Sequence, residues 1–316
     1  MRNLPLRVGT RGSPLARQQT ATFLGLLSTF CPVLKGMQVF EEHIIVTTGD
    51  EVQNRPLAEI GGKGLFAKEI HEQLLAGTID FAVHSLKDLE TVLPEGISLA
   101  CTLKREDARD ALILPAGTPI DPADPLSALK PGALIGSASV RRQAQMKYAR
   151  PDLNFTLLRG NVGTRLAKVE TGTLDATLLA YAGLKRLDLA EKASIILSPE
   201  QMVPAACQGI VGVTVRTDDT ELLSLLSAIE DPEAKAVSTA ERALLGALDG
   251  SCRTPIGGYA RLVGDDSLHL TGLVARADGS FLLQRSLTGA VADAAYLGRT
   301  LGEALKAESP EDIFAP

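Results

Sequence analysis

Short runs of β-forming residues alternate with stretches of helical periodicity along most of this chain. This alternation is typical of α/β domains with largely parallel sheets. One helix is expected to begin at Ser13-Pro14, because serine is a favoured N-cap and proline a favoured first helical residue. Strands are predicted at residues 6–10, 39–47, 79–84, 111–114, 133–137, 154–158, 175–180 and 210–215.

The last part of the chain has a different pattern. Turn signals such as Gly264-Asp265-Asp266 and Asp278-Gly279 separate its apolar runs, which is typical of antiparallel hairpins. A length of 316 residues favours two or three domains. We therefore predict an α/β fold with two α/β domains and a small C-terminal α+β domain, whose strands lie at 258–263, 268–275 and 281–288 and whose closing helix spans 292–307.

Composition excludes several classes of function. The net charge of −6 gives no global basic field for nucleic acid or an anionic membrane, and aromatics make up only 4% of the residues. The four cysteines are widely spaced, which argues against a disulfide framework or a zinc site. No apolar stretch approaches the ~20 residues of a membrane span. We expect a soluble cytoplasmic protein that binds neither nucleic acid nor membrane, with no metal.

Arginines cluster where predicted strands end and helices begin. Three junctions carry them, at residues 10–14, 137–142 and 158–165. Ligands of open α/β sheets bind beyond the carboxyl ends of strands, and helix N-termini attract anions. Arg141 and Arg142 in a first helical turn oppose the helix dipole by roughly 0.3–1 kcal/mol each, so an anion is expected in front of them. A solvated or salt-bridged surface turn is the alternative, but three such junctions together favour a polyanionic ligand.

Asp88 lies just past the predicted strand 79–84, where catalytic groups collect. A carboxylate among arginines could stabilise a cation or accept a hydrogen bond from a ring N–H; an ordinary turn cap is the alternative. The neighbouring pair His84 and Ser85 does not form a catalytic dyad, because adjacent strand residues point to opposite faces.

Cys252 lies in a loop rich in glycine and proline, Gly250-Ser251-Cys252-Arg253-Thr254-Pro255. A lone cysteine is usually a small buried hydrophobe. Such packing is less expected in an irregular loop, so a chemical role for this thiol stays open beside the ordinary one.

Taken together, these motifs resemble the porphobilinogen deaminase (hydroxymethylbilane synthase) family, and the resemblance runs nearly end to end. It rests above all on S-V-R-R-Q (139–143), L-R-G-N-V-G-T-R (158–165) and G-S-C-x-x-P-I-G (250–257). Further matching motifs are T-R-x-S-P-L-A (10–16), T-x-G-D (47–50), G-G-K-G-L-F-x-K-E (61–69), A-V-H-S-x-K-D (82–88), R-E-D-x-R-D (105–110), A-G-L-K-R-L (182–187), Q-G (208–209) and A-E-R (240–242).

The resemblance implies a reaction and a cofactor. Four porphobilinogen molecules are joined head to tail with loss of ammonia, and water releases hydroxymethylbilane. The family's primer is a dipyrromethane held by a thioether, here to Cys252, and Asp88 is the implied catalytic group. Each substrate carries an acetate and a propionate, for which arginine is the best geometric match. The implied cofactor- and substrate-binding residues are Arg11, Ser13, Gln19, Lys63, Ser85, Lys87, Ser139, Arg141, Arg142, Arg159, Arg165, Arg186 and Gln208.

The resemblance also implies the domain organisation. Two domains resemble the halves of a periplasmic anion-binding protein: residues 1–104 with 209–229, and residues 109–204. The third, residues 232–316, carries the cofactor cysteine. Residues 48–63 are expected to form a mobile loop over the cleft. The protein is expected to act as a monomer on a small molecule.

Some positions depart from the family pattern. Ala138 stands where a second hydroxyl residue is usual, Glu90 replaces a common proline, and Cys207 and Ile210 flank the Q-G motif. Two other functions are alternatives. An anion-binding receptor would suit the first two domains but has no use for the thiol loop, and a thiol hydrolase needs a histidine base, for which His269 is the nearest candidate in sequence.

Overall fold

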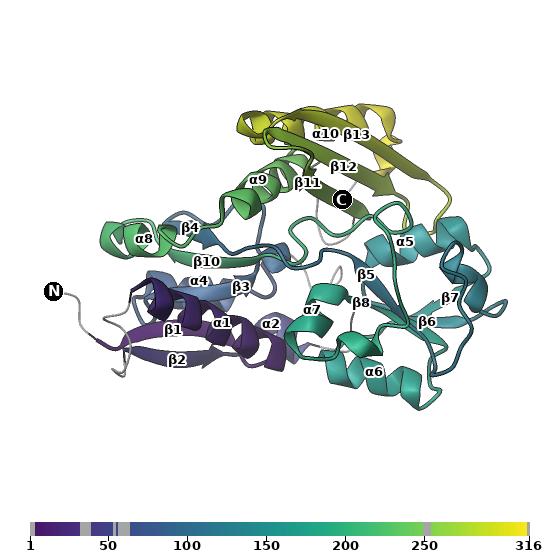
Figure 1. The fold of residues 1–316 in the computed structure, drawn as a ribbon, viewed down its shortest axis with the longest axis horizontal. Helices are drawn as coiled ribbons and strands as arrows, with labels where there is room; N and C mark the ends of the chain where they lie inside the picture. Colours follow the sequence, from purple (N-terminus) through teal and green to yellow (C-terminus); the bar gives the residue numbers. More distant parts are fainter. Residues whose placement is uncertain (1–3, 32–38, 53–54, 56–63, 249–253, 315–316) are drawn as a thin grey trace. The chain divides into compact units, whose positions relative to one another are not determined.

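The computed structural model describes residues 4–31, 39–52, 55, 64–248 and 254–314 (Figure 1). The chain divides into two compact units. Unit 1 consists of Met1–Val52, Lys63–Glu106 and Ile210–Lys235, and unit 2 of Gln53–Gly62, Asp107–Gly209 and Ala236–Pro316.

Unit 1 is built on a five-stranded mixed sheet in the order β2-β1-β3-β10-β4. Strand β1 pairs in parallel with β2 and β3, whereas β10 runs antiparallel to both β3 and β4. Parallel β1 and β3 therefore end at the same edge of the sheet. The strands are β1 Leu6–Arg11, β2 Phe40–Ile45, β3 Phe81–Ser85, β4 Ile97–Thr102 and β10 Val211–Arg216.

Helices cover both faces of this sheet, and the alternation of strand side chains explains how. Phe81 and Val83 of β3 belong to the core formed with helices α1 (Pro14–Phe30) and α8 (Thr220–Ser227). Ala82, between them, belongs to the core formed with α4 (Lys68–Leu75). Burial on both faces is typical of the central strands of α/β sheets.

Unit 2 contains a second five-stranded mixed sheet, in the order β7-β6-β8-β5-β9. Helix α5 (Val140–Ala149) packs on one face through Met146, while α6 (Val162–Glu170) and α7 (Tyr181–Arg186) pack on the other. Strand β6 pairs in parallel with β7 and β8, and β5 is antiparallel to β8 and β9. The strands are β5 Asp110–Ile113, β6 Leu134–Gly136, β7 Asn154–Thr156, β8 Ala176–Ala180 and β9 Ile195–Ile196.

A three-stranded antiparallel sheet completes unit 2, with β11 (Ile256–Leu262), β12 (Ser267–Ala275) and β13 (Leu282–Ala290) in sequential order. Helix α10 (Ala294–Glu308) packs against β12 and β13. It also lies against the C-terminal half of α9 (Pro232–Ala247), where Gly298 permits a close approach to the backbone of Ala240.

The structure confirms the expected α/β class, with two sheet regions and a C-terminal α+β region, and it corrects the sheets in one respect. They are mixed rather than largely parallel, because β5 and β10 run against their neighbours. Strand β4 was not predicted at all. The predicted domain boundaries stay predictions.

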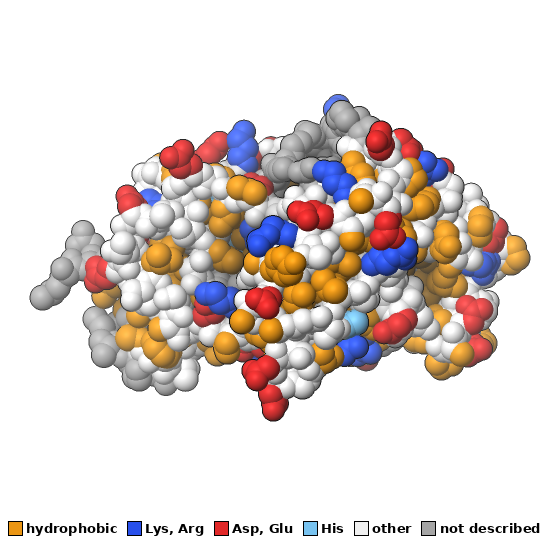
Figure 2. Space-filling view, turned by 90° about the horizontal axis from the view of Figure 1, so that it is seen from above, with side chains coloured by type: hydrophobic (Ala, Val, Ile, Leu, Met, Phe, Trp, Pro, Cys, Tyr) orange, Lys and Arg blue, Asp and Glu red, His pale blue; other side chains and the backbone are white. Residues whose placement is uncertain are grey.

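Among the described helices, none combines the length and the apolar character that crossing a bilayer requires. On the face drawn in Figure 2, acidic and basic side chains are interspersed with apolar ones rather than gathered by sign.

Candidate active site

The carboxyl-end edge of β1 and β3 brings together three charged side chains of unit 1. Arg11 is the last residue of β1, and Asp88 ends a single 3-10 turn, Leu86–Asp88, that directly follows β3. Asp50 lies in the short helix α2 (Thr48–Glu51). Arg11 Nη1 lies 3.9 Å from Asp88 Oδ2, and the same guanidinium forms a two-point pair with Asp50.

Asp50 is held from several sides. Arg11 Nε donates to its Oδ2 at 3.1 Å, and Arg11 Nη2 donates to its Oδ1. The Thr47 hydroxyl donates to Asp50 Oδ2 at 2.8 Å, and Thr47 and Asp50 form the capping box that starts α2. Burial alone would raise the pKa of Asp50, but the hydrogen bond and charge of Arg11, with Thr47, outweigh it and lower the pKa. Asp50 is therefore ionised at neutral pH.

The polar side chains around this edge are fixed by local contacts. Ser13 caps α1 and accepts from the Ala16 amide, as the sequence predicts. Ser85 pairs with the buried Gln19, whose Nε2 donates to Ser85 Oγ at 2.9 Å. Lys87, in the turn after β3, is exposed.

His84 does not face Ser85. Its Nε2 lies 2.8 Å from the hydroxyl of Thr214, on the neighbouring strand β10. Burial, with the nearby charges of His71 and Arg11, lowers the pKa of His84 to about 3. The inference that His84 and Ser85 form no dyad is therefore confirmed.

In unit 2, a buried ionic cluster joins β5 to α5. Arg141 Nη2 donates to Asp110 Oδ2 at 2.8 Å, and Arg142 Nη2 donates to Asp110 Oδ1 at 2.7 Å. Gln208 Nε2 adds a hydrogen bond to Oδ1 at 2.9 Å. Arg141 and Arg142 thus have a carboxylate of the chain itself as their partner, so their presence in the first turn of α5 does not require a ligand.

Burial alone would raise the pKa of Asp110, whose side chain is 0% exposed, but the charges of Arg141 and Arg142 outweigh it and lower the pKa. The two arginine side chains are only 6% and 8% exposed. Ser139 caps α5 and accepts from the Arg142 amide, so this junction is fixed by local capping as well. That the two arginines bind a ligand stays a prediction.

The other predicted arginines of unit 2 lie near helix starts and loops. Arg165 Nε donates to the carbonyl of Gly160 at 2.9 Å, and Asn161 caps α6. Arg186 Nη2 donates to the carbonyl of Gly209 at 2.6 Å. Arg159 is half-buried, like Arg165 and Arg186. Lys63 and Cys252, by contrast, lie outside the described residues.

Sequence reasoning assigned no role to Asp50 or Asp110. Both lie in quoted motifs, T-x-G-D and R-E-D-x-R-D, so the signal was present. From the sequence alone the arginines are candidate ligand-binding cations, because no local pattern connects them to these carboxylates.

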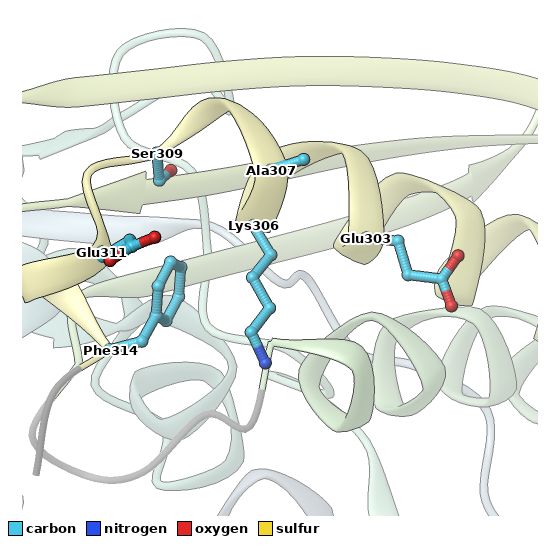
Figure 3. Close-up of a pocket in the computed structure, with 6 residues that line it drawn as sticks. All are labelled: Glu303, Lys306, Ala307, Ser309, Glu311 and Phe314. Atoms are coloured by element: carbon cyan, nitrogen blue, oxygen red, sulfur yellow. The ribbon is translucent and has the colours of Figure 1, made fainter.

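A pocket of about 480 Å³ lies at the C-terminal end of α10, away from the predicted site residues in sequence (Figure 3). It is lined by Glu303, Lys306, Ala307, Ser309, Glu311 and Phe314. No group of three or more metal-ligating side chains occurs among the residues with described positions.

An α/β protein with arginines, hydroxyls and a carboxylate at strand ends is a typical binder of small anionic molecules. Comparison with known proteins points to one family. The family model "Porphobilinogen deaminase, dipyromethane cofactor binding domain" matches residues 6–224, and "Porphobilinogen deaminase, C-terminal domain" matches residues 235–307. The chain belongs to the porphobilinogen deaminase family.

Curated relatives are similar in sequence to this chain over nearly its whole length. The porphobilinogen deaminase of Paracoccus denitrificans (strain Pd 1222) is 46% identical over 310 residues, covering 98% of this chain and 96% of the relative. The chloroplastic porphobilinogen deaminase of Oryza sativa subsp. japonica is 44% identical, covering 98% and 85%. Among solved structures, an ancestral cationic amino acid solute binding protein is 16% identical with a TM-score of 0.44, covering 71% of this chain and 87% of that one.

Proposed function

We propose that this chain joins four porphobilinogen molecules head to tail, with loss of ammonia, to give hydroxymethylbilane on a dipyrromethane cofactor bound through a thioether to Cys252. The observation that carries the proposal is the match of two consecutive family models over almost the entire chain. A monomer in the cytoplasm is part of the same proposal.

The described residues suit such a cofactor chemically. Its carboxylates call for guanidinium, ammonium and hydroxyl donors, and its ring N–H groups call for an acceptor. Arg11, Lys87 and the Ser85–Gln19 pair offer the donors in unit 1, and Asp88 offers the acceptor. When bound, the cofactor supplies the pyrrole ring to which the first substrate is joined.

In unit 2, Arg159, Arg165 and Arg186 are the favoured binders of substrate or cofactor carboxylates, because their side chains are partly exposed. Ser139, Arg141, Arg142 and Gln208 are proposed as well. The last three share the carboxylate of Asp110, so a ligand would reach only the small exposed part of each. Lys63 is proposed as a further contact.

Asp88 is proposed as the catalytic residue. When the C–N bond of the substrate's aminomethyl group breaks, ammonia leaves and positive charge develops on the pyrrole. A carboxylate at the ring N–H stabilises that charge. It can also take the proton that the attacked ring carbon releases. Asp88 is half-buried, so one side of the group remains open to a substrate.

Replacement of Asp88 by asparagine tests this role. Asp88→Asn keeps the shape but removes the charge, so kcat should fall by about 10²–10⁴-fold while the cofactor is retained. Glu95→Gln, at an exposed position of the same unit, is the matched control and should leave kcat unchanged. Near-normal turnover of porphobilinogen by Asp88→Asn would overturn the assignment.

A further inference from the structure

The Arg11 guanidinium faces two carboxylates at unequal range. Its Nε and Nη2 form a two-point pair with Asp50, whereas its Nη1 lies 3.9 Å from Asp88. Charge-assisted two-point pairs are stronger and better oriented than a single distant contact. The positive charge of Arg11 is therefore compensated mainly by Asp50 and only weakly by Asp88.

Asp50 is itself held in place. The capping box with Thr47 fixes it to the first turn of α2. The ring of Phe66 lies under the guanidinium, with its centroid 4.2 Å from Arg11 Cζ, and this cation–π contact fixes the plane of Arg11. Gly49 makes room for the same ring, because a Cβ there would lie 2.3 Å from Phe66 Cε1. Both partners of the pair are thus oriented by neighbours.

We infer that Asp50 is a positioning residue that holds Arg11 away from Asp88 and so leaves the Asp88 carboxylate available to the substrate. The inference rests on the proposed function. If the Asp50 charge is removed, Arg11 loses its stronger partner. Because Arg11 Nη1 already lies 3.9 Å from Asp88 Oδ2, the guanidinium can then pair directly with Asp88. An arginine paired directly with Asp88 would occupy the acceptor and cancel the charge that stabilises the developing cation.

Asp50→Asn tests this inference through a pH profile. The substitution keeps the size of the side chain and a hydrogen-bonding oxygen for Thr47, but it removes the charge that compensates Arg11. We expect kcat to fall at least tenfold. We also expect the acid limb of the kcat profile to move to lower pH, since a closer arginine makes Asp88 harder to protonate.

Glu51→Gln is the matched control, because it removes the same charge from an exposed neighbour on the same short helix. Its acid limb should stay in place. Asp50→Glu restores the charge and should recover part of the lost kcat. Circular dichroism on each variant separates these effects from loss of fold.

A double-mutant cycle tests the route of the effect. If Asp50 acts through Arg11, then Asp50→Asn combined with Arg11→Gln should be no slower than Arg11→Gln alone. Additive losses, or an unmoved acid limb in folded Asp50→Asn, would overturn the inference. If the unmodified protein itself fails to turn over porphobilinogen, the proposed function fails instead, so the two failures are distinguishable.

Discussion

At the scale of single residues, the buried ionic cluster around Asp110 is expected to contribute to stability. Its carboxylate is fully buried and accepts from Arg141, Arg142 and Gln208. Removing one partner of a buried ion pair leaves an uncompensated charge, which costs far more than the pair contributes.

Asp110→Asn should therefore lower the free energy of unfolding by about 3–5 kcal/mol, measured by urea denaturation. Glu170→Gln breaks a partly exposed pair with Lys192 in the same unit and should change the free energy of unfolding little. Equal stability of Asp110→Asn and the unmodified protein would show that the buried pair is not a determinant of stability.

The residue scale is also where sequence prediction was weakest. The cap at Ser13 was predictable, since its partner Ala16 is three residues away. The partner of Arg141 is Asp110, and no local pattern connects the two. The sequence shows a cation at a helix start, but the fold decides whether a ligand or a buried carboxylate faces it.

At the scale of elements, helix starts and turns were predictable and sheet order was not. Proline, serine and glycine signals act within a few residues, so α1 and the turns of the C-terminal sheet were found. Strand β4 and the direction of β10 depend on pairing between segments far apart in the chain. The residue pattern of a strand does not show whether that strand runs parallel or antiparallel to its neighbours.

Helix contacts give a prediction at this scale. Gly298 of α10 lies so close to α9 that a Cβ would stand 2.2 Å from the Ala240 carbonyl oxygen. Gly298→Ala should therefore lower the free energy of unfolding by about 1–3 kcal/mol, because the two helices must separate.

Gly25 of α1 is the matched contrast. It is exposed in a helix interior, and a Cβ there would meet nothing within 4 Å. Gly25→Ala should raise the free energy of unfolding by about 0.5–1 kcal/mol. If both substitutions shift stability in the same direction, the close packing of α9 and α10 is not what Gly298 serves.

At the scale of the whole molecule, two buried histidines predict sensitivity to acid. Burial lowers the pKa of His71, although the nearby Glu90 opposes the shift, and burial lowers the pKa of His84 to about 3. The lowered pKa keeps each histidine neutral in the folded protein at a pH where an unfolded chain already takes up protons, below about pH 6.5. Their contribution to stability is therefore present above that pH and is lost as the pH falls, and for His84 the loss continues down to about pH 3.

Between about pH 6.5 and its folded-state pKa of about 3, His84 should lower the free energy of unfolding by up to about 1.4 kcal/mol per pH unit. His84→Gln should reduce this slope in urea denaturation series between pH 7 and about 4, since glutamine keeps a hydrogen bond to Thr214 but does not titrate. A slope unchanged by the substitution would contradict the inference that His84 contributes to the loss of stability in acid.

Intact mass spectrometry of the purified protein tests whether a dipyrromethane is attached to the chain at Cys252. We expect a mass above that of the 316-residue chain by two pyrrole units in the protein of native sequence and in Asp88→Asn, and no excess in Cys252→Ser. An unmodified mass for the native chain, or an excess that persists in Cys252→Ser, would contradict this attachment.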